Sequence, residues 1–347
     1  MPRAKTRLYD NATLSVIIRF HTEDRLAFLE EAIFSLAIQE WVDLEILVVL
    51  QNGTEDLRQA VAEIVNHQPW PVGPQHKIIT VDIPGNIDGR STLLNRGIEH
   101  ATGRYLAFLD DDDFVYHHGY TTLIRQLMRG EHAIAVGGCR RAVVQYESQH
   151  WFVQTKDNFF NWGRSRSDLF KENFVPIHSY VIDRSRISTF ELSFNDSLSL
   201  LEDYDFLLRL FAEFEPDFST LDVPVCEYRI RTDGSNSIPH TPNASPEARA
   251  KLKQAQQHIH ERKKSLISRM PLFEQIELTR GLNLGNTVQA PEGSMESRRV
   301  MLKVAQEIYE FFSRHPWWEE RLSKALHNGW EVYSRHKQKR MGKPLAG

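Results

Sequence analysis

Short apolar runs alternate with amphipathic stretches along the first third of the chain. Leu14–Phe20 and Leu44–Leu50 are short runs made mostly of β-branched and other apolar residues, the pattern of buried strands. Between them, Asp24–Gln39 carries apolar residues at spacings of three and four, which predicts an amphipathic helix. The same alternation continues to residue 109 and predicts helices over Thr54–His67 and Arg90–Ala101 and strands over Lys77–Ile83 and Arg104–Leu109.

This alternation predicts an α/β fold. Because strands joined through helices pair in parallel with right-handed crossovers, we expect a Rossmann-like, mainly parallel sheet flanked by helices on both faces. Ligands of such sheets bind beyond the carboxyl ends of the strands. The residues that directly follow Phe20, Leu50, Ile83 and Leu109 should therefore surround one crevice.

The rest of the chain divides into a mixed middle part and a polar, helical end. Strands are predicted over Ala133–Gly138, Ala142–Tyr146 and Val175–Ile182, and a helix over Asp203–Phe214. Trp151–Phe174 is rich in aromatic residues without a clear period and is interpreted as a long functional loop. The turn-rich Asp233–Pro246 is taken as a domain boundary, so that a main domain over residues 11–240 precedes a C-terminal helical accessory region over residues 247–340.

The composition limits which classes of partner and which cellular compartment we expect. The formal net charge of −4 gives no global field that would favour nucleic acid, which we do not expect as a partner. Cys139 and Cys226 are too few for a disulfide scaffold or a four-cysteine zinc site, and they fit a reducing compartment. The polar N-terminus does not have the pattern of a secretory signal, and the apolar runs are too short to span a bilayer. We expect a cytoplasmic protein, or at most one attached to a membrane surface.

Four adjacent aspartates, Asp110 to Asp113, directly follow the predicted strand Arg104–Leu109. Their carboxylates repel one another unless a cation compensates them. Oxygen ligands suit Mg²⁺ or Mn²⁺, which commonly bridge a protein carboxylate to substrate phosphates. This predicts a divalent metal as the cofactor; the alternative is a solvated acidic turn that caps the next helix.

A second acidic group, Glu202 and Asp203, opens the helix predicted from residue 203. Carboxylates are common in a first helical turn because they complement the helix dipole. The functional alternative is that Asp203 accepts the proton of an attacking hydroxyl, with Glu202 positioning it or binding an acceptor hydroxyl.

Taken together, these segments resemble the family-2 glycosyltransferases with the nucleotide-diphospho-sugar transferase fold. The resemblance spans about Asn11 to Ser237 and follows the order of the family. It is carried by SVIIRFHTED, EILVVLQNGTED, GNIDGRSTLLNRGIEHATGRYLAFLDDDD, FNDSLSLLEDYDFLLRL and YRIRTDGSNS.

The resemblance implies a role for each matching position. Asp110 and Asp112 would be the outer members of the Asp-x-Asp signature, with Asp112 the favoured metal ligand and Asp110 nearer the donor ribose or sugar; Asp111 is the variable middle position. Asp203 would be the base, with Glu202 beside it, in an inverting displacement. The residues implied to bind the donor diphosphate or to shape its loop are Arg90, Asn86 and Gly89.

This chain departs from the family pattern at several positions that face the predicted crevice. Gln51 replaces an acid that often contacts the base, and its amide still suits the edge of uracil. Arg231 stands where many members have histidine; it does not bind a metal, but it can clamp a phosphate. Arg19 and His21 depart from the usual first loop and would face the donor, with a packing or surface role as the alternative.

Two residues are candidates for the acceptor side. His178 lies where relatives place acceptor-facing residues, although we favour a hydrogen-bonded core histidine. Trp162 belongs to the aromatic stretch that could stack on a sugar or anchor the predicted loop. In the C-terminal region, aromatic and basic residues suggest either a helical unit with a solvated tail, which we favour, or a weak peripheral membrane contact.

The sequence thus predicts an inverting glycosyltransferase of polysaccharide or glycoconjugate synthesis. The expected partners are a nucleotide-sugar donor, with UDP-hexose favoured, and a glycan or glycolipid acceptor. Two alternatives stay open: a non-catalytic sugar-nucleotide-binding module, and a nucleotidyltransferase on the same fold, which the absence of glycine from Arg19–Asp24 disfavours. The oligomeric state is left open.

Overall fold

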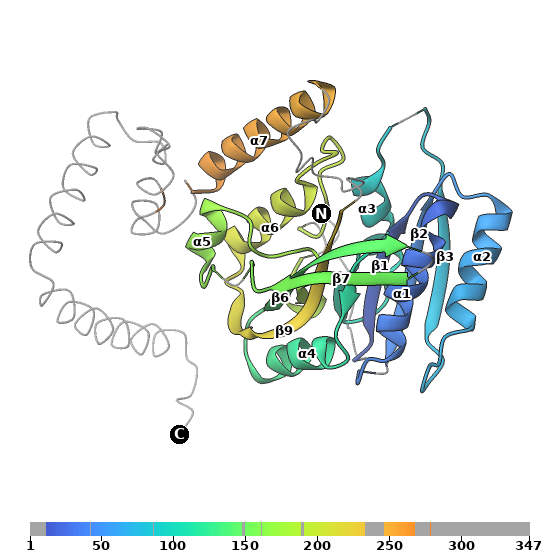
Figure 1. Ribbon diagram of the computed structural model, residues 1–347. Coiled ribbons are helices and arrows are strands. Elements are labelled where there is room, and N and C mark those ends of the chain that lie inside the picture. The colour runs from blue at the N-terminus through green and yellow to red at the C-terminus, as the bar shows by residue number, and fades with distance from the viewer. Residues whose placement is uncertain are drawn as a thin grey trace, which may run out of the picture. The chain divides into compact units, whose positions relative to one another are not determined.

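The computed structural model describes residues 12–41, 43–85, 87–147, 150–160, 162–188, 191–232, 246–267 and 278. Its first part repeats a strand–helix unit (Figure 1). The strands are β1 (Leu14–Phe20), β2 (Leu44–Gln51), β3 (Gln75–Val81) and β4 (Tyr105–Phe108). The helices between them are the 3₁₀ turn η1 (Glu23–Arg25), α1 (Leu26–Ala37), α2 (Glu55–Asn66) and α3 (Arg90–His100).

The second part mixes strands and helices of very different lengths. It contains β5 (Phe114–Val115), α4 (Gly119–Arg129), β6 (Ile134–Glu147), β7 (His150–Asp157), α5 (Arg166–Lys171), β8 (Tyr180–Asp183), η2 (Arg184–Arg186), α6 (Glu202–Glu213), β9 (Asp217–Arg231) and α7 (Pro246–Ile267). The α/β fold class is confirmed, with strand and helix boundaries in the first part within about two residues of the expected ones.

All the strands belong to one sheet in the order β3-β2-β1-β4-β8-β6-β9-β5, with β7 paired to β6. The strands β1 to β4 pair in parallel, whereas β8 is antiparallel to both β4 and β6. Successive residues of β1 enter different cores, since Val16 and Ile18 pack with α1, α2 and α4, while Ile17 packs with α3 and α6. The sheet is therefore covered on both faces, as the apolar runs predicted.

The register places the functional loops at one edge of the sheet. Phe20 is paired with Leu50, Gln51 with Val81, and Ile17 with Phe108, so β1 to β4 end close to the same line. The residues that follow these strands line a common cavity, which confirms the expected crevice.

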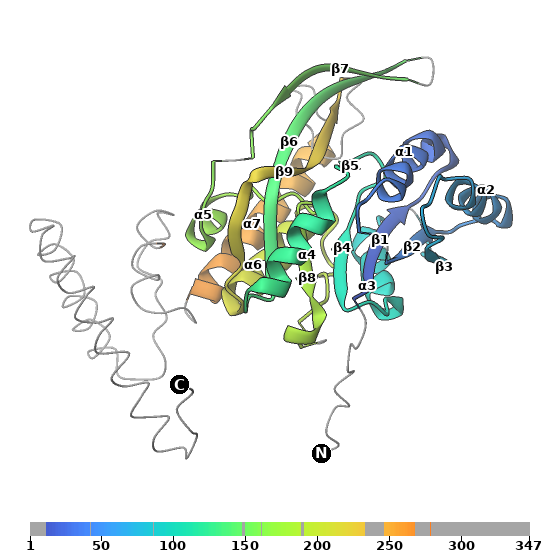
Figure 2. The same cartoon turned by 90° about the horizontal axis from the view of Figure 1, so that it is seen from below.

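The interpretation of Trp151–Phe174 as a long loop is wrong. Its first residues form β7, which pairs with β6 as a long antiparallel ribbon that leaves the body of the sheet (Figure 2), and α5 follows at Arg166. Residues 152 to 156 are exposed, so they show no alternation between buried and exposed positions from which a strand could be predicted. The two predicted strands Ala133–Gly138 and Ala142–Tyr146 are likewise one strand, β6.

The strand predicted over Val175–Ile182 begins only at Tyr180. Pro176 lacks an N–H, and its carbonyl accepts hydrogen bonds from the backbone N–H and hydroxyl of Ser179 in a turn. This turn carries His178 into the interior, where it is fully buried.

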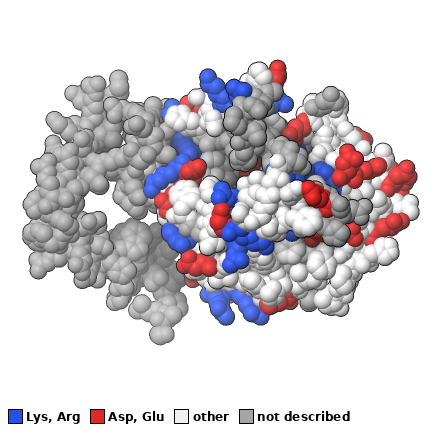
Figure 3. Space-filling model, viewed as in Figure 1, with Lys and Arg blue, Asp and Glu red and all other residues white. Residues whose placement is uncertain are grey.

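On the face seen in Figure 3, positively and negatively charged side chains lie mainly in different regions. Lys and Arg side chains gather over the middle of this face, where the β6–β7 ribbon runs in Figure 1, and Asp and Glu side chains lie mainly on the side that carries α2. Arg141 on β6 and Lys156 on β7 pair with Asp157 and Glu227, so part of this basic charge is already compensated.

Helix α7 packs on α6 and belongs to the same compact unit, Met1–Val288; a second unit is Gln289–Gly347. The buried carboxylate of Asp205 on α6 accepts hydrogen bonds from His258 Nε2 at 3.0 Å and Arg262 Nε at 2.7 Å. The domain division near residue 240 remains a prediction, and the aromatic and basic residues predicted to form the C-terminal helical end lie outside the described residues.

Gly97 provides a test of how α3 packs on β1. A Cβ at Gly97 would lie 2.5 Å from Ile17 Cγ2, whereas a Cβ at Gly73 would meet nothing within 4 Å. Gly97→Ala is expected to lower the free energy of unfolding by about 1–3 kcal/mol through overpacking. Gly73→Ala, the matched control, should change it by less than about 0.5 kcal/mol. Urea denaturation measures both, and equal stabilities of the two variants would contradict this packing.

Candidate active site

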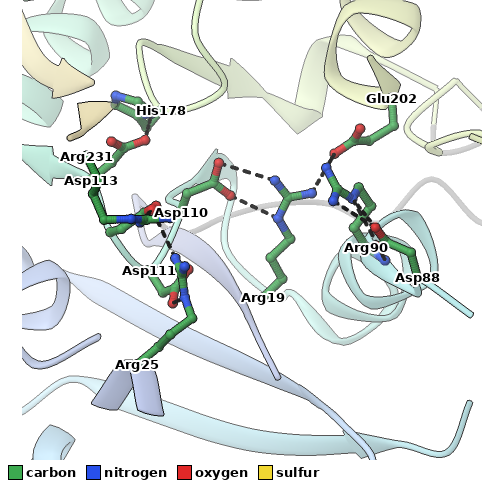
Figure 4. Close-up of polar contacts among 11 residues, drawn as sticks. Arg19, Arg25, Asp88, Arg90, Asp110, Asp111, Asp113, His178, Glu202 and Arg231 are labelled. Carbon is green, nitrogen blue, oxygen red and sulfur yellow. Dashed lines mark hydrogen bonds and ion pairs between the residues drawn. The ribbon is translucent and has the colours of Figure 1, made fainter. Parts of the chain in front are cut away.

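The aspartate run lies in the turn after β4, and each of its carboxylates has a partner from a distant part of the chain (Figure 4). Asp110 accepts two hydrogen bonds from Arg19, at 3.0 Å from Nε and 3.2 Å from Nη2. Burial raises the pKa of Asp110, but the Arg19 guanidinium outweighs it and holds the pKa below its ordinary value. Asp110 is therefore ionised at neutral pH.

Two arginines hold the next two carboxylates. Arg25, in the turn η1, donates to both oxygens of Asp111 at 2.6 and 2.8 Å and lies 3.0 Å from Asp112 Oδ2. Arg231, at the end of β9, donates to the same oxygen of Asp112. Burial raises the pKa of Asp111 to about 6 against the hydrogen bonds from Arg25.

Asp113 differs from the other three because it points into the interior and is 2% exposed. It accepts a hydrogen bond from the backbone N–H of Arg229 at 2.8 Å. Its other oxygen lies 3.2 Å from His178 Nδ1, although this contact does not have the geometry of a hydrogen bond. Asp113 thus connects the turn after β4 to β9 and to the loop before β8.

A cavity of about 500 Å³ opens in front of the first three aspartates. This volume is in the range of small-molecule sites. Four aspartates and three arginines border it, so its lining carries an excess of negative charge. The lining residues are Arg19, Phe20, His21, Arg25, Gln51, Asn52, Gly85, Ile87, Asp88, Arg90, Leu93, Asp110, Asp111 and Asp112.

The first turn of α6 faces the same arginines. Glu202 Oε1 accepts a hydrogen bond from Arg19 Nη1 at 2.5 Å and lies 3.8 Å from Arg90 Nη1. Arg90 also forms an ion pair of 2.7 Å with Asp88. Arg19 therefore links the aspartate run to the beginning of α6.

Asp203 follows Glu202 in the first turn of α6 and is half-buried. Burial, together with the neighbouring carboxylate of Glu202, raises the pKa of Asp203 to about 7. Such a carboxyl group is ready to exchange a proton near neutral pH, as a general base must. The residue before the pair, Leu201, has φ 59°, a left-handed conformation that is uncommon for leucine and sets the direction in which α6 begins.

The loop between β3 and α3 is held from β2. Gln51 donates from Nε2 to the carbonyl of Ile87 at 2.8 Å and accepts from the backbone N–H of Gly89 at 3.2 Å. A Cβ at Gly89 would lie 1.9 Å from Ile83 Cδ1, so a larger residue there would displace the end of the Ile83 side chain. Gln51 thus borders the cavity, but its amide is bound to the loop. Asn86 lies outside the described residues.

The other three candidate residues, His21, Trp162 and His178, lie in different parts of the fold. His21 is exposed and lines the cavity, and burial of its ring together with Arg25 lowers its pKa, so it is neutral at pH 7. Trp162 packs on Phe174 with ring centres 5.2 Å apart and is not among the residues that line the cavity. His178 has no exposed surface, which favours the core interpretation over contact with an acceptor.

Arg25 and Asp88 are site residues that the sequence did not reveal. Arg25 was counted as part of the first amphipathic helix, and Asp88 as part of a loop, because the partners Asp111, Asp112 and Arg90 are identified only by the fold. Asp88 lies within the quoted segment GNIDGRSTLL and Arg25 directly follows SVIIRFHTED, but no residue spacing in these segments indicated the role of either residue.

The donor set fits a divalent ion. Asp110 and Asp112 present carboxylate oxygens to the cavity, which Mg²⁺ and Mn²⁺ prefer. Their side chains are 21% and 18% exposed, and the lining carries more negative than positive charge before a diphosphate adds to it. An ion at Asp112 would compete with Arg25 and Arg231 for its carboxylate.

Comparison with known proteins shows which family part of the chain matches. Residues 15–185 match the family model described as Glycosyl transferase family 2. The chain is 26% identical over 238 residues to the uncharacterized glycosyltransferase EpsJ of Bacillus subtilis, a match that covers 66% of this chain and 64% of EpsJ. It is 30% identical over 135 residues to the GalNAc(5)-diNAcBac-PP-undecaprenol beta-1,3-glucosyltransferase of Campylobacter jejuni, covering 36% of this chain and 38% of that enzyme.

The fold is also similar to that of solved structures. TarS of S. aureus matches with a TM-score of 0.53 and 13% identity, covering 78% of this chain and 43% of TarS. A structure of its residues 1–349 in complex with UDP-GlcNAc matches with a TM-score of 0.50 and 13% identity, covering 80% and 81% of the two chains. None of the described helices combines the length and the apolar character needed to cross a membrane. Residues 15–185 therefore match glycosyltransferase family 2, and the described fold is similar to that of TarS.

Proposed function

We propose that the protein transfers a hexose from a UDP-sugar to a hydroxyl group of a glycan or glycolipid, with inversion at the anomeric carbon. The observation that carries this proposal is that Arg19, which lines the cavity in front of the aspartate run, binds both Asp110 and Glu202 in the acidic first turn of α6. At the cavity, Arg90 and a divalent ion bound by the aspartate run would offer positive charge for a diphosphate, and the first turn of α6 beyond Arg19 carries Asp203, whose pKa is about 7. These are the two requirements of a single displacement at a nucleotide sugar.

Relatives support the class of donor and acceptor. TarS was solved with UDP and with UDP-GlcNAc, and the name of the C. jejuni enzyme describes a glucosyltransferase that acts on a polyprenol-linked glycan. The matched region spans less than two thirds of the length of EpsJ and of the C. jejuni enzyme, so the acceptor class is part of the proposal. Polysaccharide or glycoconjugate synthesis in the cytoplasm fits both the acceptor and the donor.

The donor would bind with its diphosphate beside the aspartate run. Asp112 and Asp110 would hold a divalent ion, Mn²⁺ or Mg²⁺, that neutralises the charge developing on the leaving nucleoside diphosphate. Arg90 is the guanidinium at the N-terminus of α3, a place where backbone N–H groups also favour an anion. Gln51 and Gly89 keep the loop at the edge of the cavity in place.

Asp203 accepts the proton of the acceptor hydroxyl in this proposal. Arg19 joins Glu202 to Asp110 and so fixes the distance between the base and the donor side. Glu202 is held by Arg19 beside Asp203, and burial together with this neighbouring carboxyl group raises the pKa of Asp203. In this acid pair, Glu202 thus positions Asp203, and Asp203 exchanges the proton.

Asp203→Asn tests the assignment of the base. The amide cannot take the proton, so kcat should fall by about 10²–10⁴-fold while the Kd of the donor changes little. Transfer is measured with radiolabelled UDP-sugar, and donor binding by calorimetry with Mn²⁺. The matched control is Asp222→Asn, since Asp222 is 85% exposed and pairs with Arg164 outside the cavity. A normal turnover of Asp203→Asn would remove Asp203 from the mechanism.

The pH dependence gives a second test. Because burial and Glu202 raise the pKa of Asp203 to about 7, the base is protonated and inactive below that pH. We expect kcat/KM to decrease about tenfold per pH unit on the acid side and to level off on the alkaline side. Initial rates between about pH 5 and 9 measure the profile. The residual activity of Asp203→Asn should lack this limb, and the same limb in both proteins would contradict the assignment.

A further inference from the structure

Three soft metal ligands meet in the core behind the aspartate run. Cys139 on β6 and Cys226 on β9 are register partners on neighbouring strands, and His178 reaches them from the loop before β8. None of the three is more than 2% exposed. Their ligand atoms all lie within 4.8 Å of one another, and among the described residues they form the one group of three or more His, Cys, Asp or Glu side chains that is this close.

The distances are near those of a tetrahedral zinc site. Zinc bonds of about 2.3 Å to sulfur and 2.0–2.1 Å to nitrogen imply ligand separations of about 3.8 Å between sulfurs and 3.6 Å between sulfur and nitrogen. Cys139 Sγ lies 3.8 Å from His178 Nε2. Since the largest separation in the group is within 4.8 Å, shifts of about 1 Å suffice to close the site.

The surroundings of the imidazole match those of a metal-bound histidine. The ring nitrogen that faces away from the cysteines, Nδ1, lies 3.2 Å from Asp113 Oδ2. Histidine ligands usually direct their second nitrogen to a carboxylate, which fixes the ring and strengthens the ligand. Nδ1 is also one of the buried polar atoms that lack a well-formed hydrogen bond, and such atoms are uncommon in folded proteins.

Metal binding would change which atoms of the group carry protons. A bound ion would replace the proton on Nε2 and the proton of each thiol, while Nδ1 keeps its proton toward Asp113.

We propose that Cys139, Cys226 and His178 bind one structural zinc ion. Thiolate ligands select zinc over the hard ions Mg²⁺ and Mn²⁺, so this site is distinct from the carboxylate site at Asp110 and Asp112. A solvent molecule or a main-chain oxygen completes the tetrahedron, because no further Cys, His, Asp or Glu among the described residues joins the group. The ion joins β6, β9 and the loop before β8, and Asp113 extends this connection to the aspartate run.

The test is the metal content of the intact, full-length chain. The protein is produced in zinc-supplemented medium, passed over a chelating resin and measured by plasma mass spectrometry. We expect about one zinc per chain in the unsubstituted protein and in Asp112→Asn, which alters only the carboxylate site. Cys226→Ser should contain less than about a tenth of that amount.

Cobalt substitution gives a reading that does not depend on the variants. Co²⁺ added anaerobically to chelator-treated protein should produce a thiolate-to-cobalt charge-transfer band, and zinc should abolish it. If Cys226→Ser does not fold, the zinc content and the cobalt spectrum of the unsubstituted chain decide. Folded, unsubstituted protein that takes up neither zinc nor cobalt, or zinc retained in full by a folded Cys226→Ser, would overturn the proposal and leave a hydrogen-bonded thiol pair.

Discussion

The site depends on one constraint, which is that the negative charge of four adjacent carboxylates has to be compensated. The turn after β4 places Asp110 to Asp113 side by side, and groups from distant parts of the chain relieve their repulsion. Arg19 comes from the end of β1, Arg25 from η1, and Arg231 from the end of β9. The charged centre is therefore complete only when the first strands and the last strand of the sheet have come together.

The same arginines explain how the two acidic groups are connected. Arg19 binds Asp110 with two nitrogens and Glu202 with the third, so the donor side and the first turn of α6 share one guanidinium. Helix α7 supports α6 from outside through Asp205. Asp113 and His178 lie on the interior side of the run, where an oxygen-rich surface gives way to a sulfur-containing core. Asp113 thus lies between the carboxylates proposed to bind a divalent ion and the cysteines proposed to bind zinc.

The sequence was informative where the signal is local. The strands Leu14–Phe20 and Leu44–Leu50 were recognised because both faces of the sheet are covered and most positions are apolar, and the common edge followed from parallel pairing. Prediction failed at β7, whose exposed residues carry no alternation, and at Arg25, whose partners Asp111 and Asp112 are far away in sequence. It also failed at Asp88, because no sequence pattern placed this residue at the cavity beside Arg90. His178 was expected in the core, but its two cysteine neighbours are 39 and 48 positions away, and no spacing motif joins them.

The most direct test of the account is a crystal structure of the chain with UDP and Mn²⁺. The account predicts nucleotide and ion together in the cavity bordered by Asp110, Asp112 and Arg90, with the carboxylate of Asp112 transferred from arginine to the ion. A nucleotide bound elsewhere, or a filled cavity in which Arg25 and Arg231 still hold Asp112 and no ion is present, would contradict it.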